Sequence, residues 1–204
     1  MYIPKYYREE DRKEILAFLK HNNFAALVTC DGESPIATHT PVEIVESENG
    51  WIVYGHISRA NAQKKTFDGR EALLIFQGAH TYISARWYDK VDVPTWNYKI
   101  VQLQGVVRKL QGNELFSVLS RLVQSHEADT HYRLENLPQE FVQKEMNGVI
   151  GFALQVTGID AGYKLSQPET QEDRKNIVNE LEKRGDEYSM EIARSIRERN
   201  HAGK

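Results

Sequence analysis

Hydrophobic and polar residues alternate with a period of two along several stretches of the chain, a pattern typical of strands that bury one face. In residues 101–108, Val101, Leu103 and Val107 alternate with polar or small neighbours, and residues 150–156 place large side chains on one face only. Further strand-like runs occupy residues 24–29, 35–46, 51–57, 71–76 and 80–84. Asp31–Gly32, between the first two of these runs, is typical of a hairpin turn. The pattern therefore predicts a sheet of mainly antiparallel strands.

A helical period is found in four places before residue 150. Residues 8–22 combine an acidic first turn with apolar residues on one face, and residues 115–123 have the clearest apolar stripe. Pro138 is placed to open a short helix, and residues 60–67, after the third strand, are compatible with another. We expect these helices to pack on the sheet.

From Thr170 onward the chain changes from strand-like to helical patterns. Thr170 and Asp173 have the spacing of a capping box, and Gly185 is placed to end the helix that they begin. A final helix is expected over about residues 186–200. Both helices carry charges of mixed sign, which favours a solvated outer face rather than a nucleic-acid arm.

The order of these elements favours a mainly β fold with added helices, of the α+β class. Strands joined mostly by hairpins, with a helical segment after the third strand, are typical of an antiparallel barrel surrounded by helices. We expect residues 1–168 to form the barrel domain and residues 169–204 to form a C-terminal helical extension.

Composition narrows the functional classes. The 204 residues are 40% hydrophobic, enough for a sizeable core, and the formal net charge of −3 provides no general attraction for nucleic acid or anionic lipid. The sequence has no apolar run of about 20 residues and no signal-peptide pattern at its start, so we expect a cytoplasmic protein without membrane contact. The single cysteine, Cys30, can form no disulfide within the chain and is expected to be a small buried residue rather than a nucleophile.

Hydrogen-bond donors gather where the third predicted strand ends. Ser58, Arg59 and Asn61 stand at the change from strand to helical segment, followed by Lys64 and Lys65. A helix start has unpaired N–H groups and a positive dipole end, and a guanidinium beside it fits a phosphate monoester. The alternative is that Ser58 or Asn61 caps the helix and Arg59 pairs with a surface carboxylate.

Three histidines on or beside strands, His39, His56 and His80, raise the question of a metal or haem site. They come from three separate segments, and their spacing does not force them to converge, which favours packed or hydrogen-bonded histidines.

Residues 85–97 are expected to form a loop that is rich in aromatic side chains. Trp87, Tyr88, Trp96 and Tyr98 lie in it or beside it. Such rings suit stacking on a planar ligand, and they equally suit packing across a subunit interface. Both hold if the ligand lies between subunits.

Several motifs occur together in an order that is specific. The segments "THTP", "GWIVYGHISRANAQ", "GAHTYISARWY" and "VPTWNY", followed by "GVIGFALQVTGIDAGYKLSQ", resemble the PaiB-type family of FMN-binding negative transcriptional regulators. The resemblance runs from Tyr2 to the helix that begins near Thr170. It implies a Greek-key split β-barrel that forms a homodimer, with FMN at the subunit interface.

The resemblance also implies roles for individual residues. The FMN phosphate would lie at Ser58, Arg59 and Asn61, aided by Lys64 or Lys65, with His56 on the same strand. The edge of the isoalloxazine ring would follow the second strand. The residues implied there are Thr38, His39 and Thr40, and those implied to close the site from the neighbouring subunit are Trp96 and Tyr98.

As to function, the resemblance implies repression of genes for extracellular protease production and sporulation. No helix-turn-helix pattern stands out. The protein either binds promoter DNA directly or acts on it through a partner, and the sequence does not separate these two alternatives. The alternative function is a flavin-dependent oxidoreductase related to pyridoxamine 5′-phosphate oxidases, and a third is a haem-handling split barrel with a histidine ligand. The oxidase branch has an Arg-to-Lys motif on its second strand, whereas "THTPVEIV" has neither residue, which disfavours pyridoxamine phosphate oxidation.

Overall fold

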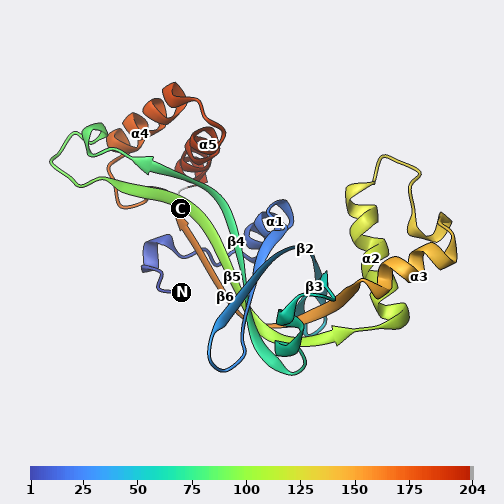
Figure 1. The fold of residues 1–204 in the computed structure, drawn as a ribbon. Coiled ribbons are helices and arrows are strands. Elements are labelled where there is room, and N and C mark those ends of the chain that lie inside the picture. Colours follow the sequence, from blue (N-terminus) through green and yellow to red (C-terminus); the bar gives the residue numbers. More distant parts are fainter. Residues whose placement is uncertain (203–204) are drawn as a thin grey trace. The chain divides into compact units, whose positions relative to one another are not determined.

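The computed structural model describes residues 1–202, with strands and helices as shown in Figure 1. The strands are β1 (Phe24–Cys30), β2 (Pro35–Ser47), β3 (Gly50–Ser58), β4 (Arg70–Ile83), β5 (Thr95–Leu110) and β6 (Val149–Lys164). The α-helices are α1 (Arg12–His21), α2 (Gly112–His126), α3 (Gln139–Asn147), α4 (Gln171–Arg184) and α5 (Glu187–Ala202). The 3₁₀ helices are η1 (Lys5–Tyr7), η2 (Ala62–Thr66), η3 (Ala85–Trp87) and η4 (Leu134–Asn136).

Within residues 1–202, six strands close a barrel in the order β1-β2-β3-β6-β5-β4. β1 pairs antiparallel with both β2 and β4, and β3 pairs antiparallel with both β2 and β6. The predicted α+β class and antiparallel barrel are confirmed.

The chain divides into two compact units. One unit, which we call the barrel unit, comprises Leu16–Phe76 and Gln102–Ile159. The other, which we call the arm unit, comprises Met1–Ile15, Gln77–Val101 and the chain from Asp160 onward. The division expected from the sequence, at residue 168, stays a prediction.

Alternating burial along the strands fixes which side chains fill the barrel. On β3, Trp51, Val53, Gly55 and Ile57 are buried, while the alternate residues Ile52, Tyr54 and His56 are partly exposed. Gly105 on β5 is required by a close approach, because a Cβ there would lie 2.2 Å from the backbone oxygen of Gln155. The residues that alternate with a period of two in the sequence therefore include those that point into the barrel.

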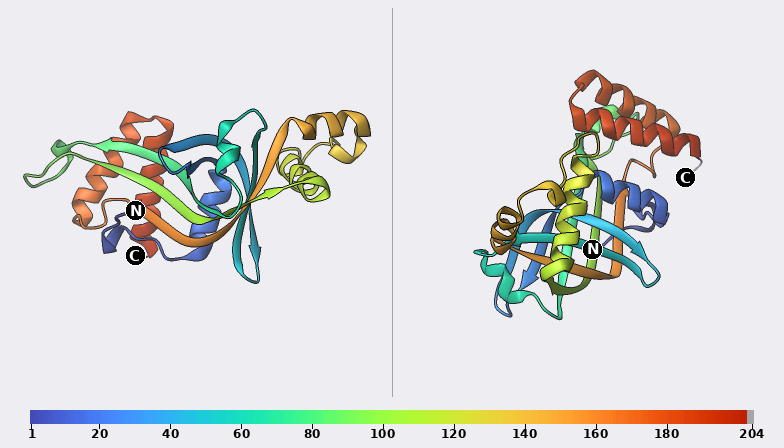
Figure 2. Two further views of the ribbon diagram at one scale, coloured as in Figure 1. Left: turned by 60° about the horizontal axis from the view of Figure 1, so that its bottom comes forward. Right: turned by 90° about the vertical axis from the view of Figure 1, so that its right-hand side faces the viewer.

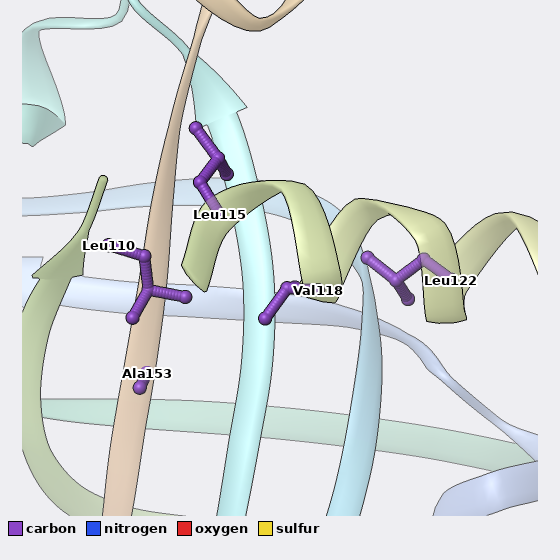
Figure 3. Packing of buried hydrophobic residues seen from close by; sticks show 5 residues of the cluster. All are labelled: Leu110, Leu115, Val118, Leu122 and Ala153. Atoms are coloured by element: carbon purple, nitrogen blue, oxygen red, sulfur yellow. The ribbon is translucent and has the colours of Figure 1, made fainter. Parts of the chain in front are cut away.

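The outer face of β3 is covered by α2. Figure 3 shows Leu115, Val118 and Leu122 along this helix, with Leu110 and Ala153 on strands of the barrel beside it. These five side chains form a buried apolar cluster, which fixes α2 on the strands. The apolar stripe predicted over residues 115–123 is thus the face that α2 buries.

In the arm unit, α4 and α5 pack against each other, as both views in Figure 2 show. The Thr170 hydroxyl accepts a hydrogen bond from the Asp173 backbone N–H at 3.1 Å, and Gly185 adopts φ +73° after the last turn of α4. The predicted cap and stop signals are both confirmed.

Some local expectations were wrong. Residues 71–76 and 80–84 were expected to form two strands, but a single strand, β4, runs through Arg70–Ile83. Trp96 and Tyr98 belong to β5 and not to a loop. Cys30 is exposed because it ends β1 on the outward side of the alternation, so the expectation of a buried cysteine fails. No helix among the described residues is long and apolar enough to cross a membrane.

Candidate functional site

The end of β3 makes a tight polar turn into η2. The Ser58 carbonyl accepts a hydrogen bond from the Asn61 N–H at 3.0 Å, and the Ser58 hydroxyl oxygen accepts one from the Ala60 N–H at 3.2 Å. The Asn61 side-chain oxygen accepts a hydrogen bond from the Gln63 N–H at 2.9 Å and so caps η2. The capping interpretation of Asn61 is confirmed, although the helix is a short 3₁₀ turn with a weaker dipole than an α-helix would have.

Two threonines of β2 face this turn. The Asn61 amide nitrogen donates a hydrogen bond to the Thr38 hydroxyl oxygen at 2.7 Å, and the Thr40 hydroxyl donates one to the His56 carbonyl at 2.6 Å. Alternation along the strand sends Thr38 and Thr40 to the same face. The structure thus brings Thr38 to the polar turn that the sequence singled out, while Thr40 binds the β3 backbone two residues before Ser58.

Arg59 fastens this turn to the end of α3. Its Nε donates a hydrogen bond to the Asn147 carbonyl at 2.5 Å, and its Nη2 donates one to the Val149 carbonyl at 3.1 Å. The Arg59 backbone N–H also donates a hydrogen bond to the Gly148 carbonyl at 2.8 Å. A cation is stabilised at a helix C-terminus, so Arg59 pairs with carbonyl oxygens and not with the surface carboxylate of the alternative interpretation.

Some donor capacity remains at the turn. Among the described residues, Arg59 Nη1 takes part in no hydrogen bond and no carboxylate pairs with the guanidinium. Lys64 Nζ donates a hydrogen bond to the Arg59 carbonyl at 2.5 Å, which places a second cation beside the turn. Ser58 and Arg59 are exposed, so their remaining donors face solvent.

Gln63 and Thr66 anchor η2 to the barrel, a role that the sequence did not reveal. The Gln63 amide nitrogen lies 2.9 Å from the Leu27 carbonyl and 3.1 Å from the Ile36 carbonyl, and the Thr66 hydroxyl lies 2.5 Å from the Thr29 hydroxyl. Both side chains are fully buried. Glutamine in a polar helical stretch gives no signal of burial, because its partners lie on other strands.

His39 and His56 face away from the polar turn. His39 projects to the outer face of the barrel, where its ring stacks on Phe24 with centroids 5.9 Å apart. His56 Nδ1 is buried without a hydrogen-bond partner among the described residues, and burial lowers the pKa of the imidazole. No group of three or more His, Cys, Asp or Glu side chains in the described part of the chain is placed to hold a metal ion.

Two of the cavities beside α3 in the barrel unit are lined by residues that the sequence assigned to the cofactor site. The larger, of about 670 Å³, has Arg59 and Lys109 on its rim together with amide side chains such as Asn147. The second, of about 540 Å³, is a mainly apolar groove between α2, α3 and His56. Volumes of this size suit small-molecule ligands.

Trp96 and Tyr98, the residues expected to close the site, belong to the arm unit. Trp96 is 53% exposed, and its ring centroid lies 6.1 Å from those of His80 and Tyr82. His80 also lies 4.9 Å from Tyr188. These rings form an exposed aromatic cluster, and the part of Trp96 and Tyr98 in a flavin site stays a prediction.

The sequence matches the family model FMN_bind_2, described as "Putative FMN-binding domain", over residues 1–158. It is 34% identical over 196 residues to "Protease synthase and sporulation protein PAI 2" of Bacillus subtilis (strain 168), covering 95% of each chain. Its fold resembles two solved structures at a TM-score of 0.63. The first is the flavocytochrome Anf3 from Azotobacter vinelandii, which is 15% identical, and the match covers 85% of this chain and 78% of that chain. The second is the FAD and heme binding protein from Mycobacterium smegmatis, which is 13% identical, and the match covers 85% of this chain and 80% of that chain.

Proposed function

Because this chain belongs to the FMN-binding family that includes the PaiB-type proteins, we propose that it binds FMN and acts as a PaiB-like negative transcriptional regulator. The family match covers all ten residues that the sequence assigned to the cofactor. The strand end after β3 supplies a guanidinium, an ammonium and a hydroxyl within seven residues, and these are donors that suit a dianionic phosphate.

The observation that supports the phosphate position best is the unused donor capacity of Arg59. Carbonyl oxygens hold two of its nitrogens, which fixes the plane of the guanidinium, and Nη1 has no partner among the described residues. A fixed guanidinium whose Nη1 keeps both of its N–H groups open is preorganised for phosphate oxygens. Ser58 and Lys64 stand on the same turn and would add donors.

The flavin ring would lie along β2, near Thr38, His39 and Thr40, with His56 on the adjoining strand. When bound, FMN supplies the redox or light-absorbing chemistry, while the protein supplies binding and electrostatics. The proposal includes a cytoplasmic homodimer in which Trp96 and Tyr98 of the neighbouring subunit close the site. The exposed aromatic cluster around Trp96 supports this arrangement, because exposed aromatic rings are enriched where subunits meet.

The regulatory role rests on the similarity to the Bacillus subtilis protein, whose name refers to protease synthesis and sporulation. The net charge of −3 gives no general attraction for DNA, so repression through a partner is as consistent with the chain as direct promoter contact. The absence of Arg and Lys from Thr38–Val45 disfavours the alternative, an oxidoreductase related to pyridoxamine 5′-phosphate oxidases. A gel-shift titration with promoter DNA, with and without FMN, separates direct from indirect repression.

Titration of the purified protein with FMN and with riboflavin tests the cofactor proposal. We expect flavin fluorescence to be quenched on binding, and Arg59→Ala to weaken FMN roughly 10- to 100-fold, the size of one lost hydrogen bond to a charged group. Riboflavin lacks the phosphate, so its affinity should change much less.

Arg108→Ala is the matched control, because it removes an exposed arginine that pairs with Glu114 elsewhere in the barrel unit. Its FMN affinity should equal that of the wild type. Equal losses of FMN and riboflavin affinity in Arg59→Ala would remove the phosphate role of Arg59, and the absence of any quenching would refute the cofactor itself.

A further inference from the structure

The apolar groove beside His56 is separate from the polar turn that the FMN proposal uses. It is lined by α2 and α3, which lie near each other in Figure 1, and by His56 on the outer face of β3. Its walls are mainly apolar, formed by Leu119, Leu122 and Val123 of α2 and by Phe141, Val142 and Met146 of α3. Its volume of about 540 Å³ is within the range of sites for small organic molecules.

α3 is poorly packed for a helix with an apolar face. None of its residues is buried, and Phe141 is 51% exposed. The apolar side chains that α3 turns toward the groove therefore lack part of the contacts that a packed helix makes. A ligand that filled the groove would bury these side chains and stabilise the helix.

The polar residues of the groove select the charge of such a ligand. No lysine or arginine lines it, whereas Glu127 and Glu145 both do. Neither carboxylate forms an ion pair with any residue between positions 1 and 202, and Glu127 accepts a hydrogen bond from the Thr130 hydroxyl at 2.8 Å. Two unpaired carboxylates beside an apolar wall attract a cation and repel an anion.

His56 adds a polar group to the wall of the groove. Its Nδ1 is buried without a partner among the described residues. Burial keeps the imidazole neutral near pH 7, so it does not neutralise the two carboxylates.

We propose that the groove between α2 and α3 is a second ligand site, which takes a small lipophilic amine. The apolar body of the ligand lies against Phe141 and Met146, and its ammonium group lies at Glu127 and Glu145. The site does not depend on FMN, since a flavin phosphate would be repelled by the same carboxylates. A ligand there packs α3 against α2. Because Arg59 is hydrogen-bonded to the end of α3, a ligand that stabilises α3 also stabilises the position of Arg59.

Three naphthalene compounds that share one body and differ in charge test the proposal by calorimetric titration. They are 1-naphthylmethylamine, 1-naphthalenemethanol and 1-naphthoate. We expect the amine to bind about tenfold more tightly than the alcohol, because an ion pair that is exposed or partly buried changes an affinity by about this factor. The carboxylate should bind most weakly.

The double variant Glu127→Gln, Glu145→Gln keeps the shape of the groove and removes its charge. It should lower the affinity of the amine to that of the alcohol and leave the alcohol unchanged. Glu140→Gln, on α3 but outside the groove, is the matched control and should behave as the wild type. Val123→Trp should fill the groove and abolish binding of all three compounds, provided that circular dichroism shows the fold to be intact.

In titrations without FMN, three outcomes would overturn the proposal: no binding of any compound, equal binding of amine and alcohol in the wild type, or a double variant that still prefers the amine. The titrations are repeated at saturating FMN. Loss of amine binding under that condition would place the flavin in the groove and refute a separate site. If FMN fails to bind at all while the amine binds as expected, only the cofactor proposal falls.

Discussion

His56 is held in the wall of the barrel unit with its Nδ1 buried and unpartnered among the described residues. Burial lowers the pKa of the imidazole below its ordinary value near 6.5, so the unfolded chain binds a proton more readily than the folded one. The stability due to neutral His56 is therefore fully present above about pH 6.5 and is lost as the pH falls toward the lowered folded pKa. We expect the free energy of unfolding to decrease between roughly pH 7 and pH 5, and to decrease less in His56→Gln.

The readout is the difference between wild type and variant in urea denaturation at each pH, because His126, Glu127 and Glu145 line the same groove and are present in both proteins. His21→Gln, which removes an exposed histidine of the barrel unit, should follow the wild-type curve. A His56→Gln protein with the same pH dependence as the wild type would show that burial does not act on this imidazole.

At the scale of the element, α4 depends on a cap that the sequence already encodes. The Thr170 hydroxyl accepts a hydrogen bond from the Asp173 N–H and donates one to the Asp173 carboxylate at 2.7 Å, which satisfies one of the open N–H groups of the first turn. Thr170→Ala should lower the free energy of unfolding by about 1 kcal/mol, as measured by urea denaturation. Gln171→Ala, in the same first turn and exposed, should change it by only a few tenths of a kcal/mol. Equal effects of the two substitutions would contradict the capping role.

At the scale of the whole molecule, the outer face of β1 is suited to contact a second copy of the chain. Phe24 is 65% exposed and stacks on His39, and Ala26 and Val28 follow it on the same face. We expect this face to be part of the interface of the proposed homodimer. We expect light scattering to give twice the chain mass of 23.5 kDa, and Phe24→Glu to give the monomer mass by placing a charge on this face.

Val106→Glu serves as the comparison, because it adds the same charge to an exposed position of β5, which β4 separates from β1 in the barrel. This variant should stay dimeric. A monomeric wild type, or a dimer that Phe24→Glu leaves intact, would contradict the use of the β1 face. FMN affinity measured on the Phe24→Glu monomer then shows whether the flavin needs both subunits.

The sequence by itself determined the parts of this protein that depend on neighbours close along the chain. The alternation in residues 150–156 put Phe152 and Leu154, both fully buried, on one face of β6, and Thr170 with Gly185 fixed both ends of α4, because pleat, cap and left-handed turn are local properties. The sequence also placed Ser58, Arg59 and Asn61 on one turn, since they lie within four residues of each other.

Only the tertiary structure decided what those side chains contact. Arg59 donates hydrogen bonds to carbonyl oxygens 88 and 90 positions away in the sequence, at the end of α3. No local sequence pattern shows that this helix lies close to Arg59 in space. Gln63 is buried against β1 and β2, and His56 lines a groove together with residues of α2 and α3. These contacts also join residues that are far apart in the sequence. Burial and pairing across the barrel depend on which strands close on one another, and that is set by the summed packing of the core rather than by any single stretch of residues.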